Sequence, residues 1–494
     1  MVVLKRLSRY ILIFLSAALF SIGKILNSFN VLVIGVFSFW IANVIYCFED
    51  IRKRIYFLMF NVAFFMLLIA RPLISMMREE VWWYFSEASE NFTLNALMIS
   101  LVFLFLGHYI SDKMSTNKNT ISENYFELSQ NSKYIQHLRT ISLCFFYVSF
   151  VFLMATKFES FRFVKSHKYT DLYLPFHSNL PSFFSLFGSM NRYFLCIFLS
   201  TFPKKSVSFM PLAMYIFSAV PLFLVGARRD IVLNVIFVFL YYFTRDSLNF
   251  YFLKQKAQKW IGKFEWSLML LCTPAAMFVL GIYNYLRSGI KTNLGIFGTI
   301  MDLFYNQGIS FDVICIAYET IPKIKYTGFT NYTFGRIIDY FLHSKIAQVL
   351  FGGTPLESGQ SVDAGLHSNI FAHRLSYTAR EQEYLEGNGW GSSFIVEPYA
   401  DFGYIGIVLI SLVIGVFLSR ALKNMNKNSL IASIVLVAMS EIYYAPRSSA
   451  LSWIDFVVYI QFIIPVVLCH SLAKLFMKEY SPKSGILTMQ KENN

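Results

Sequence analysis

Residues 30–48 read NVLVIGVFSFWIANVIYCF and contain no charged side chain. An α-helix of about 20 such residues spans the ~30 Å hydrocarbon core of a bilayer, because each residue adds about 1.5 Å. The whole chain has the same character: 56% of its 494 residues are hydrophobic and 15% are charged, whereas soluble domains average about half and a quarter. The stretch therefore predicts one transmembrane helix among many.

Further apolar runs of this length follow along the chain. With a window of about 19 residues, we predict about twelve spans, at residues 11–27, 30–48, 56–76, 94–111, 140–156, 182–202, 207–226, 230–244, 266–285, 394–418, 429–445 and 452–473. The eighth is short for an upright span, which leaves a tilted helix, a half-inserted helix or misplaced bounds.

These spans predict an all-α polytopic membrane protein with one large extracytoplasmic loop that contains short helices. The predicted divisions are an N-terminal transmembrane bundle of about nine helices (1–285), a large periplasmic or extracytoplasmic loop (286–393), C-terminal transmembrane helices (394–475) and a cytoplasmic tail (476–494).

The orientation follows from the basic residues between the spans. Lys5, Arg6 and Arg9 precede the first span, and the linkers that would share their side, such as EDIRKR (49–54) and RALKNMNKNS (420–429), are also basic. Positive charge favours the cytoplasmic side, so both termini are predicted there, in a bacterial cytoplasmic membrane. This bias, with attraction to anionic lipid headgroups, explains the net charge of +14 without a nucleic-acid partner.

The loop at 286–393 is unusual because connections between elements ordinarily run about 4 to 6 residues. Two of its segments, GTIMDLFYNQGISFDVICIAYETI (298–321) and AGLHSNIFAHRLSYTA (364–379), have helix-like apolar spacing. We expect short helices that lie over the outer membrane surface. A capping domain without chemistry and a functional domain both fit this composition.

Arginines close to the predicted outer membrane surface favour a functional domain over a capping domain without chemistry. Arg228 and Arg229 stand in VGARRD, Arg287 in NYLRSG and Arg447 in YAPRSS, each beside an apolar run. A guanidinium is always charged and forks onto phosphate oxygens, which suits it to a diphosphate at a membrane surface. The alternatives are snorkelling to lipid headgroups and, for VGARRD, neutralisation by Asp230. Because three separate connections carry arginine at one depth, we favour a shared anion site.

Two loop residues are candidates for proton transfer. His367 and Arg374 are seven residues apart, so both project from one face if the segment is helical. A guanidinium pushes a neighbouring imidazole towards its neutral form, which can accept a proton. A lone loop histidine is otherwise more often a surface hydrogen-bonding residue.

The motif GNGWG (387–391) and the glutamate that follows it complete the candidate site. Asn388, Gly389 and Gly391 give the backbone freedom to turn and to present N–H groups to an anion. Pro398 disfavours helical geometry at Glu397, so the helix should begin at Pro398 with Glu397 on its lip. There Glu397 can orient a catalytic group, accept a proton from a sugar hydroxyl, or only complement the helix dipole.

The segment HSNIFAHRLSYTAREQEYLEGNGWGSSFIVEPYADFGYIG (367–406), together with VGARRD (225–230) and YYAPRSS (443–449), resembles the O-antigen polysaccharide polymerase (Wzy) family. The resemblance implies transfer of a growing glycan from undecaprenyl diphosphate to the non-reducing end of a new lipid-linked repeat unit, at the outer face. The substrate would be an undecaprenyl-diphosphate-linked oligosaccharide, and a chain-length regulator is the candidate protein partner. The residues that would hold the diphosphate are Arg228, Arg229, Arg287, Arg374 and Arg447. His367 or Glu397 would deprotonate the acceptor hydroxyl.

The residues predict neither a metal nor another cofactor. The first outer connection, NSFN, is too short to hold a metal-binding acidic pair, and arginines can supply the positive charge that a diphosphate needs. Two other functions stay open: an O-antigen ligase, which would use the same donor, and a lipid-linked oligosaccharide flippase. A flippase should have two halves that echo each other and short loops, so the long loop argues against it.

Overall fold

The computed structural model describes residues 2–79, 85–116, 125–175, 178–252, 259–263, 265, 267, 278–282, 295–325 and 330–479. These residues form helices joined by turns and include no strand. Eleven of the described helices are long and apolar enough to cross a membrane, which confirms the all-α polytopic membrane fold. The predicted ninth span, 266–285, lies mostly outside the described residues.

The helices follow one another as the hydropathy predicts. The first group is α1 (Val2–Ile25), α2 (Phe29–Glu49), α3 (Ile51–Phe64), the π-helical turn η1 (Phe65–Ile69), α4 (Ala70–Met77) and α5 (Glu87–Thr116). The second group is α6 (Tyr125–Asn131), α7 (Lys133–Ser166), η2 (Tyr169–Tyr173), α8 (Ser182–Ser189), α9 (Asn191–Ser200), α10 (Lys205–Phe217), α11 (Val220–Phe223) and α12 (Arg229–Phe252).

The long connection and the C-terminal part contain the remaining helices. The connection contributes α14 (Ile296–Gln307), α15 (Ser310–Thr320), η3 (Ile321–Lys323), α16 (Gly335–His343), α17 (Lys345–Phe351), α18 (Val362–His367), α19 (Phe371–Ala379) and α20 (Glu381–Leu385). The C-terminal part contributes α21 (Val396–Met425), α22 (Ser429–Glu441), η4 (Ile442–Arg447), η5 (Asp455–Val458) and α23 (Ile460–Glu479).

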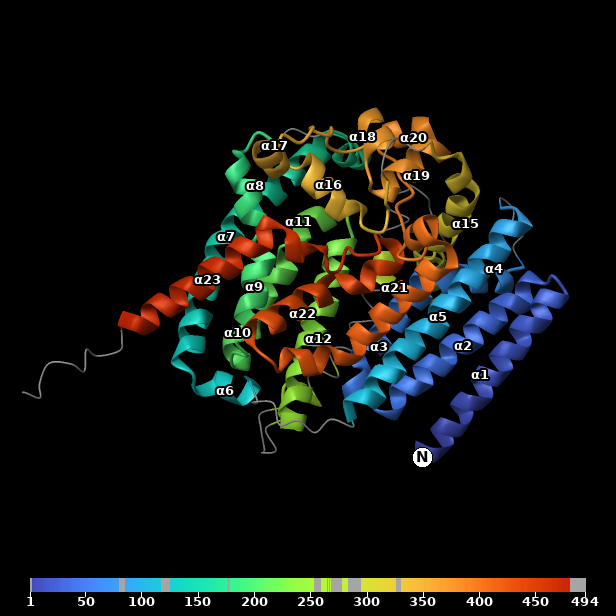
Figure 1. The fold of residues 1–494 in the computed structure, drawn as a ribbon, viewed down its shortest axis with the longest axis horizontal. Coiled ribbons are helices and arrows are strands. Elements are labelled where there is room, and N and C mark those ends of the chain that lie inside the picture. The colour runs from blue at the N-terminus through green and yellow to red at the C-terminus, as the bar shows by residue number, and fades with distance from the viewer. Residues whose placement is uncertain are drawn as a thin grey trace, which may run out of the picture.

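Helices α16 to α20 gather at one end of the bundle and are called the cap below. Figure 1 shows the cap at the top, whereas the N-terminus and α6 lie at the opposite end. The short helices predicted for the long connection are therefore present, and they cover one end of the transmembrane bundle.

Helices α5 and α21 pack closely because small residues face each other along their contact. A Cβ atom on Gly107 would lie 2.5 Å from the carbonyl oxygen of Leu412, and one on Gly415 would lie 2.3 Å from that of Leu104. The Ser100 and Ser411 hydroxyls meet at 3.0 Å. Small and hydroxyl side chains of this kind let transmembrane helices approach where lipid gives no hydrophobic driving force.

Helix α21 contains a sharp kink that the sequence did not predict. It begins at Val396, two residues before the predicted start at Pro398, and its path breaks at Gly403, where φ is 60° and ψ is −149°. Asp401, in the short piece before the kink, accepts hydrogen bonds from the backbone N–H groups of Tyr332 (3.0 Å) and Thr333 (2.6 Å). The start of α21 is thereby fastened to the loop that leads into the cap.

Two predicted spans have different bounds in the structure. The eighth is not short, because α12 continues through Arg245, whose guanidinium is buried against the rings of Phe126, Phe202 and Trp260. The last span begins at Ile460 rather than 452, because residues 448–459 form turns and η5. The buried Arg245 made the predicted eighth span too short. The apolar turn residues before Ile460 made the predicted last span too long.

Candidate active site

Two arginines and one glutamate from three transmembrane helices meet inside the bundle. Arg192 opens α9, Arg229 opens α12 and Glu441 closes α22. The Glu441 carboxylate pairs with Arg192 through one oxygen and with Arg229, at 2.6 Å, through the other. The Arg229 guanidinium also lies over the ring of Tyr444, 4.5 Å from its centroid. One carboxylate therefore holds two guanidinium groups from separate helices close together.

A second pair joins this group to the cap. Arg336, in the first turn of α16, contacts Asp455 with 2.5 Å between Nε and Oδ2. Burial raises the pKa of Asp455, and the charges of Arg336 and Arg192 oppose that rise. Burial alone would lower the pKa of Arg336, but the Asp455 carboxylate raises it. Arg336 therefore stays charged, and Asp455 lies within the field of both arginines. Below, the cap-end cluster denotes Arg192, Arg229, Arg336, Glu441 and Asp455.

Asp230 forms an ion pair with a helix other than its own. Its carboxylate binds Lys157 of α7 at 2.9 Å. Arg229 pairs instead with Glu441, and Arg228 lies partly buried just before α12. Arg229 and Asp230 of VGARRD thus form ion pairs with other helices, and the Arg229 charge also acts on Asp230.

Arg447 lies at the end of η4, which follows Glu441 directly. Six residues of 3₁₀-helix rise about 2 Å each, which puts Arg447 roughly 12 Å along the chain axis from Glu441. Arg447 is partly buried, and no hydrogen bond or ion pair joins its side chain to a residue that the structure describes. Arg287 lies outside the described residues.

Glu397 is completely buried in the first turn of α21. Its carboxylate accepts hydrogen bonds from the Ser392 hydroxyl and from the backbone N–H of Ala450, both at 2.7 Å. The charge of Arg336 also acts on it. Glu397 thus ties α21 to the connection before η5 instead of standing on an exposed lip, and this arrangement favours orientation over direct proton transfer.

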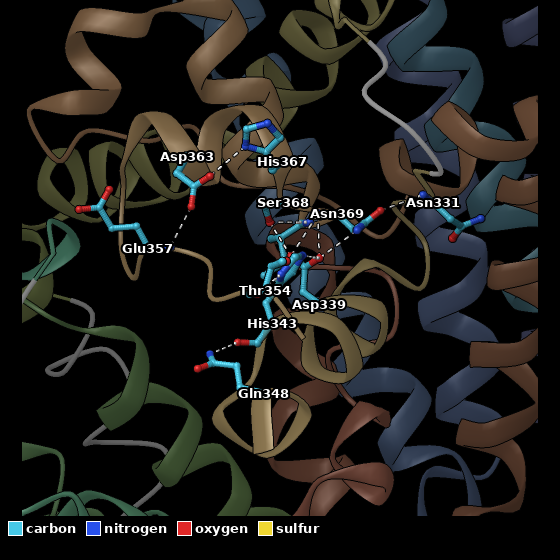
Figure 2. Close-up of polar contacts among 11 residues, drawn as sticks. Asn331, Asp339, His343, Gln348, Thr354, Glu357, Asp363, His367, Ser368 and Asn369 are labelled. Carbon is cyan, nitrogen blue, oxygen red and sulfur yellow. Dashed lines mark hydrogen bonds and ion pairs between the residues drawn. The ribbon is translucent and has the colours of Figure 1, made fainter. Parts of the chain in front are cut away.

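His367 and Arg374 do not share a helix face, because the segment that contains them is not one continuous helix. The helix breaks after His367, where Asp339 accepts hydrogen bonds from the Ser368 hydroxyl (2.6 Å) and the Asn369 backbone N–H (3.0 Å), as Figure 2 shows. His373 bonds to the Tyr384 hydroxyl at 2.7 Å. The two helices are separate because Asp339, on α16, accepts the hydrogen bonds of the residues between α18 and α19.

The two residues consequently have different environments. His367 is exposed, and its Nδ1 lies 2.9 Å from Asp363 Oδ1 (Figure 2). A backbone hydrogen bond from Glu357, reinforced by His367, lowers the pKa of Asp363 below its usual value. Arg374 is buried, and its guanidinium donates to the carbonyl oxygen of Lys325. The structure therefore leaves His367 accessible and commits Arg374 to the interior of the cap.

The loop GNGWG folds against the cap through its own backbone. The N–H of Asn388 donates to the Glu383 carbonyl at 2.9 Å, and the N–H of Trp390 donates to the Ser376 hydroxyl at 3.0 Å. Gly391 adopts a φ of 81°, which favours glycine. Gly389 lies where a Cβ would come within 2.7 Å of the Gln360 amide nitrogen. These contacts fix the loop and use two of the N–H groups that the sequence assigned to an anion nest.

Sequence reasoning missed four members of the cap-end cluster. Arg192 and Glu441 fell inside the predicted spans 182–202 and 429–445. A charged residue within a transmembrane segment usually faces the protein interior and marks a functional path, so this signal was present. Asp455 gave the same signal, because it fell inside the predicted span 452–473, whereas Arg336 carried no comparable local signal. Among the described residues, no three histidine, cysteine, aspartate or glutamate side chains come together as metal ligands would.

Comparison with known proteins gives one match. The profile of the family described as O-antigen polysaccharide polymerase Wzy matches residues 8–480, a range that includes the bundle, the cap and the whole cap-end cluster. Neither the curated proteins nor the solved structures gave a match. Because the matched range covers nearly the whole chain, this multi-pass membrane protein belongs to the O-antigen polysaccharide polymerase Wzy family, whose enzymes polymerise O-antigen from lipid-linked oligosaccharides.

Proposed function

We propose that this polymerase transfers a growing glycan from undecaprenyl diphosphate to the non-reducing end of a fresh lipid-linked repeat unit, at the extracytoplasmic face. The cap-end cluster would hold the diphosphate. One observation carries the proposal: Glu441 brings the guanidinium groups of Arg192 and Arg229 together inside the bundle.

The charge balance of the cluster suits an anionic ligand. Arg192, Arg229 and Arg336 face the carboxylates of Glu441 and Asp455. Arg228 precedes Arg229 in the sequence and adds a further positive charge at the start of α12. A diphosphate leaving group gains negative charge as the glycosidic bond breaks, and preorganised cations in a site with little water stabilise that charge strongly. Arginine forks can do so without a metal ion.

We assign His367 the role of general base for the acceptor hydroxyl. Asp363 binds Nδ1 of His367, and its lowered pKa keeps the carboxylate ionised. A carboxylate in this position fixes the imidazole orientation, and the exposed ring can then accept a proton. Glu397 would position the start of α21 beside the cluster.

We also propose that both termini are cytoplasmic and that the membrane is the bacterial inner membrane. The N-terminus lies at the end opposite the cap (Figure 1), and the basic linkers 49–54 and 420–429 follow helices that run to that end. A phosphatase reporter fused after Gly352 should be active, and one fused after Lys427 should be inactive, because the phosphatase folds only outside the cytoplasm. The reverse pattern would contradict this topology. A chain-length regulator remains the proposed protein partner.

The decisive experiment is a glycan ladder from a strain that lacks this protein. The strain is complemented with Arg192→Lys, Arg229→Lys or the matched control Arg162→Lys, which changes an exposed arginine near the cap end of α7. We expect the first two to leave lipid A core capped with a single repeat, because lysine cannot form the bidentate fork. The control should restore the full ladder.

Other outcomes of the ladder would contradict the proposal. Bare core in the uncomplemented strain would indicate a ligase or a flippase. An unchanged ladder in Arg192→Lys and Arg229→Lys, at equal protein levels, would show that the cluster does not hold the donor.

A further inference from the structure

A cavity of about 460 Å³, lined by both polar and apolar side chains, lies apart from the cap-end cluster. Its walls come from α4, α15, η3, the end of α19 and the GNGWG loop, and its polar and aromatic lining includes Arg71, Asp312, Glu319, Lys323, Arg380 and Trp390. None of the helices that supply the cluster, α9, α12, α16 and α22, contributes to it. The volume lies within the range of small-molecule sites, which is about 300–1,000 Å³.

Asp312 gives this cavity an unsatisfied acceptor. Its side chain is only 9% exposed, and one oxygen, Oδ2, pairs with Arg71 at 3.0 Å. The other oxygen, Oδ1, is buried and has no hydrogen-bond partner among the described residues. Buried polar atoms are nearly always satisfied, so an orphan acceptor on a residue that lines a cavity points to a donor that arrives with a ligand and displaces its cover.

Trp390 supplies a fixed apolar surface in the same cavity. Its backbone N–H is anchored by the Ser376 hydroxyl, and Gly391 after it adopts a positive φ. The Arg380 guanidinium lies over the indole, 5.1 Å from the ring centroid. The ring is therefore held in place by its own loop and by a cation before any ligand binds.

These groups match the chemistry of a pyranose. A sugar ring presents apolar C–H faces that pack against an aromatic ring, and its hydroxyls both donate and accept hydrogen bonds. Asp312 Oδ1 accepts only, and Arg71 beside it donates only. Such a pair can bind two hydroxyls of one ring in a fixed orientation.

We propose that this cavity is a sugar-binding subsite, in which a pyranose of the glycan chain donates a hydroxyl to Asp312 and packs against Trp390. The identity of the glycan rests on the proposed function, whereas the binding of a hydroxyl-rich sugar rests on the cavity alone. The subsite holds the carbohydrate, and the cap-end cluster holds the diphosphate.

The test uses the purified full-length protein in nanodiscs. The probe is the free oligosaccharide that mild acid releases from the lipid-linked repeat units of the source strain, so it contains no diphosphate. Titration calorimetry should show that Asp312→Asn and Trp390→Ala each weaken binding about tenfold or more, because each removes one main contact. Trp390→Phe, which keeps an aromatic surface, should retain most of the affinity.

A cluster variant separates this proposal from the proposed function. Arg192→Lys should bind the free oligosaccharide within about twofold of the parent protein, although it should no longer extend the glycan. Unchanged binding in both Asp312→Asn and Trp390→Ala would overturn the subsite. Loss of binding in Arg192→Lys equal to that in Asp312→Asn would also overturn it, because a single site would then bind both parts of the substrate. A normal ladder with Arg192→Lys would overturn the diphosphate site and leave the subsite standing.

Discussion

Arginine and carboxylate networks occur at both ends of the bundle, and they differ in balance and access. At the N-terminal end, Glu49 pairs with Arg9 at 2.7 Å and with Arg54 at 3.1 Å, and Arg54 also pairs with Asp112 at 3.1 Å. Two arginines thus meet two carboxylates, and both guanidinium groups also lie near the ring of Tyr46.

The cap-end cluster has three arginines for two carboxylates, and its cations are more accessible. The side chains of Arg192, Arg229 and Arg336 are 27%, 44% and 41% exposed, against 4% for Arg9 and 13% for Arg54. A balanced, buried network can only hold helices together. An accessible network with excess positive charge can also receive an anion, and this difference supports the proposal that the cap end binds the diphosphate.

The largest expected effect is on the rate of glycan extension at the cap end. Arg192→Lys and Arg229→Lys should each slow extension by about 10²–10³-fold, the cost of removing one preorganised donor from a developing negative charge. The measurement is chain extension by purified protein with lipid-linked repeat units. Thermal unfolding should change little. If the rate fell only because less protein was folded, the cap-end cluster would be structural, as the N-terminal network is, and the proposed difference between the two ends would be wrong.

The second prediction concerns the N-terminal network. Glu49→Gln leaves Arg9 and Arg54 short of a counter-ion in a buried place, and breaking a buried pair costs about 3 kcal/mol of unfolding free energy. We expect a lower midpoint of thermal unfolding with an unchanged extension rate per folded molecule. Glu87→Gln, which changes an exposed glutamate in the first turn of α5, is the matched control and should shift neither quantity.

The transmembrane helices could be predicted from the sequence, but the pairing of their charges could not. Apolar runs determine spans because each must cover a bilayer thickness, and this local rule placed α2 almost to the residue. A hydropathy window averages over its residues, so it hid Arg192 and Glu441 within apolar surroundings. Their contact depends on how α9 and α22 pack, which no short stretch of sequence records.

The cap shows the same limit more sharply. The spacing of AGLHSNIFAHRLSYTA correctly predicted helices, yet the break between α18 and α19 depends on Asp339, which lies on α16. The kink at Gly403 and the burial of Glu397 likewise depend on contacts between distant segments. Arg228, Arg229 and His367 keep the roles proposed for them, whereas Arg374 is committed to the interior of the cap and Glu397 to the positioning of α21.

The third prediction concerns the His367–Asp363 pair, where one carboxylate meets one imidazole at the surface of the cap. Asp363→Asn should slow extension about tenfold, because the imidazole loses its orientation while the ring itself remains. His367→Ala should lose at least as much, and Asp363→Asn combined with His367→Ala should be no worse than His367→Ala alone. Additive losses would show that the two residues act independently.

The Arg71–Asp312 pair in the sugar subsite is intermediate between the N-terminal network and the cap-end cluster. Its charges balance, but one carboxylate oxygen has no hydrogen-bond partner among the described residues. The charged groups on the elements around Asp312 are Arg71 on α4, Glu90 on α5, Glu319 on α15 itself, Lys323 on η3 and Arg380 after α19. Burial would raise the pKa of Glu319, but hydrogen bonds from Ser86 and Ser89 hold it below its usual value. Glu319 therefore stays ionised over the range in which Asp312 titrates.

The smallest expected effect is the pH dependence of this subsite. Burial raises the pKa of Asp312 to about 6, and the Arg71 charge opposes that rise. The folded protein then holds more protons than the unfolded chain between about pH 4 and pH 6, so this group lowers stability as the pH rises through that interval. Sugar binding has the opposite sign, because the ionised carboxylate accepts a hydrogen bond from a sugar hydroxyl more strongly than the protonated carboxyl group does. The affinity for the free oligosaccharide should therefore be roughly five- to tenfold weaker at pH 5 than at pH 7.5, and Asp312→Asn should abolish the difference. An affinity in the parent protein that does not vary with pH would mean that the hydroxyl binds elsewhere.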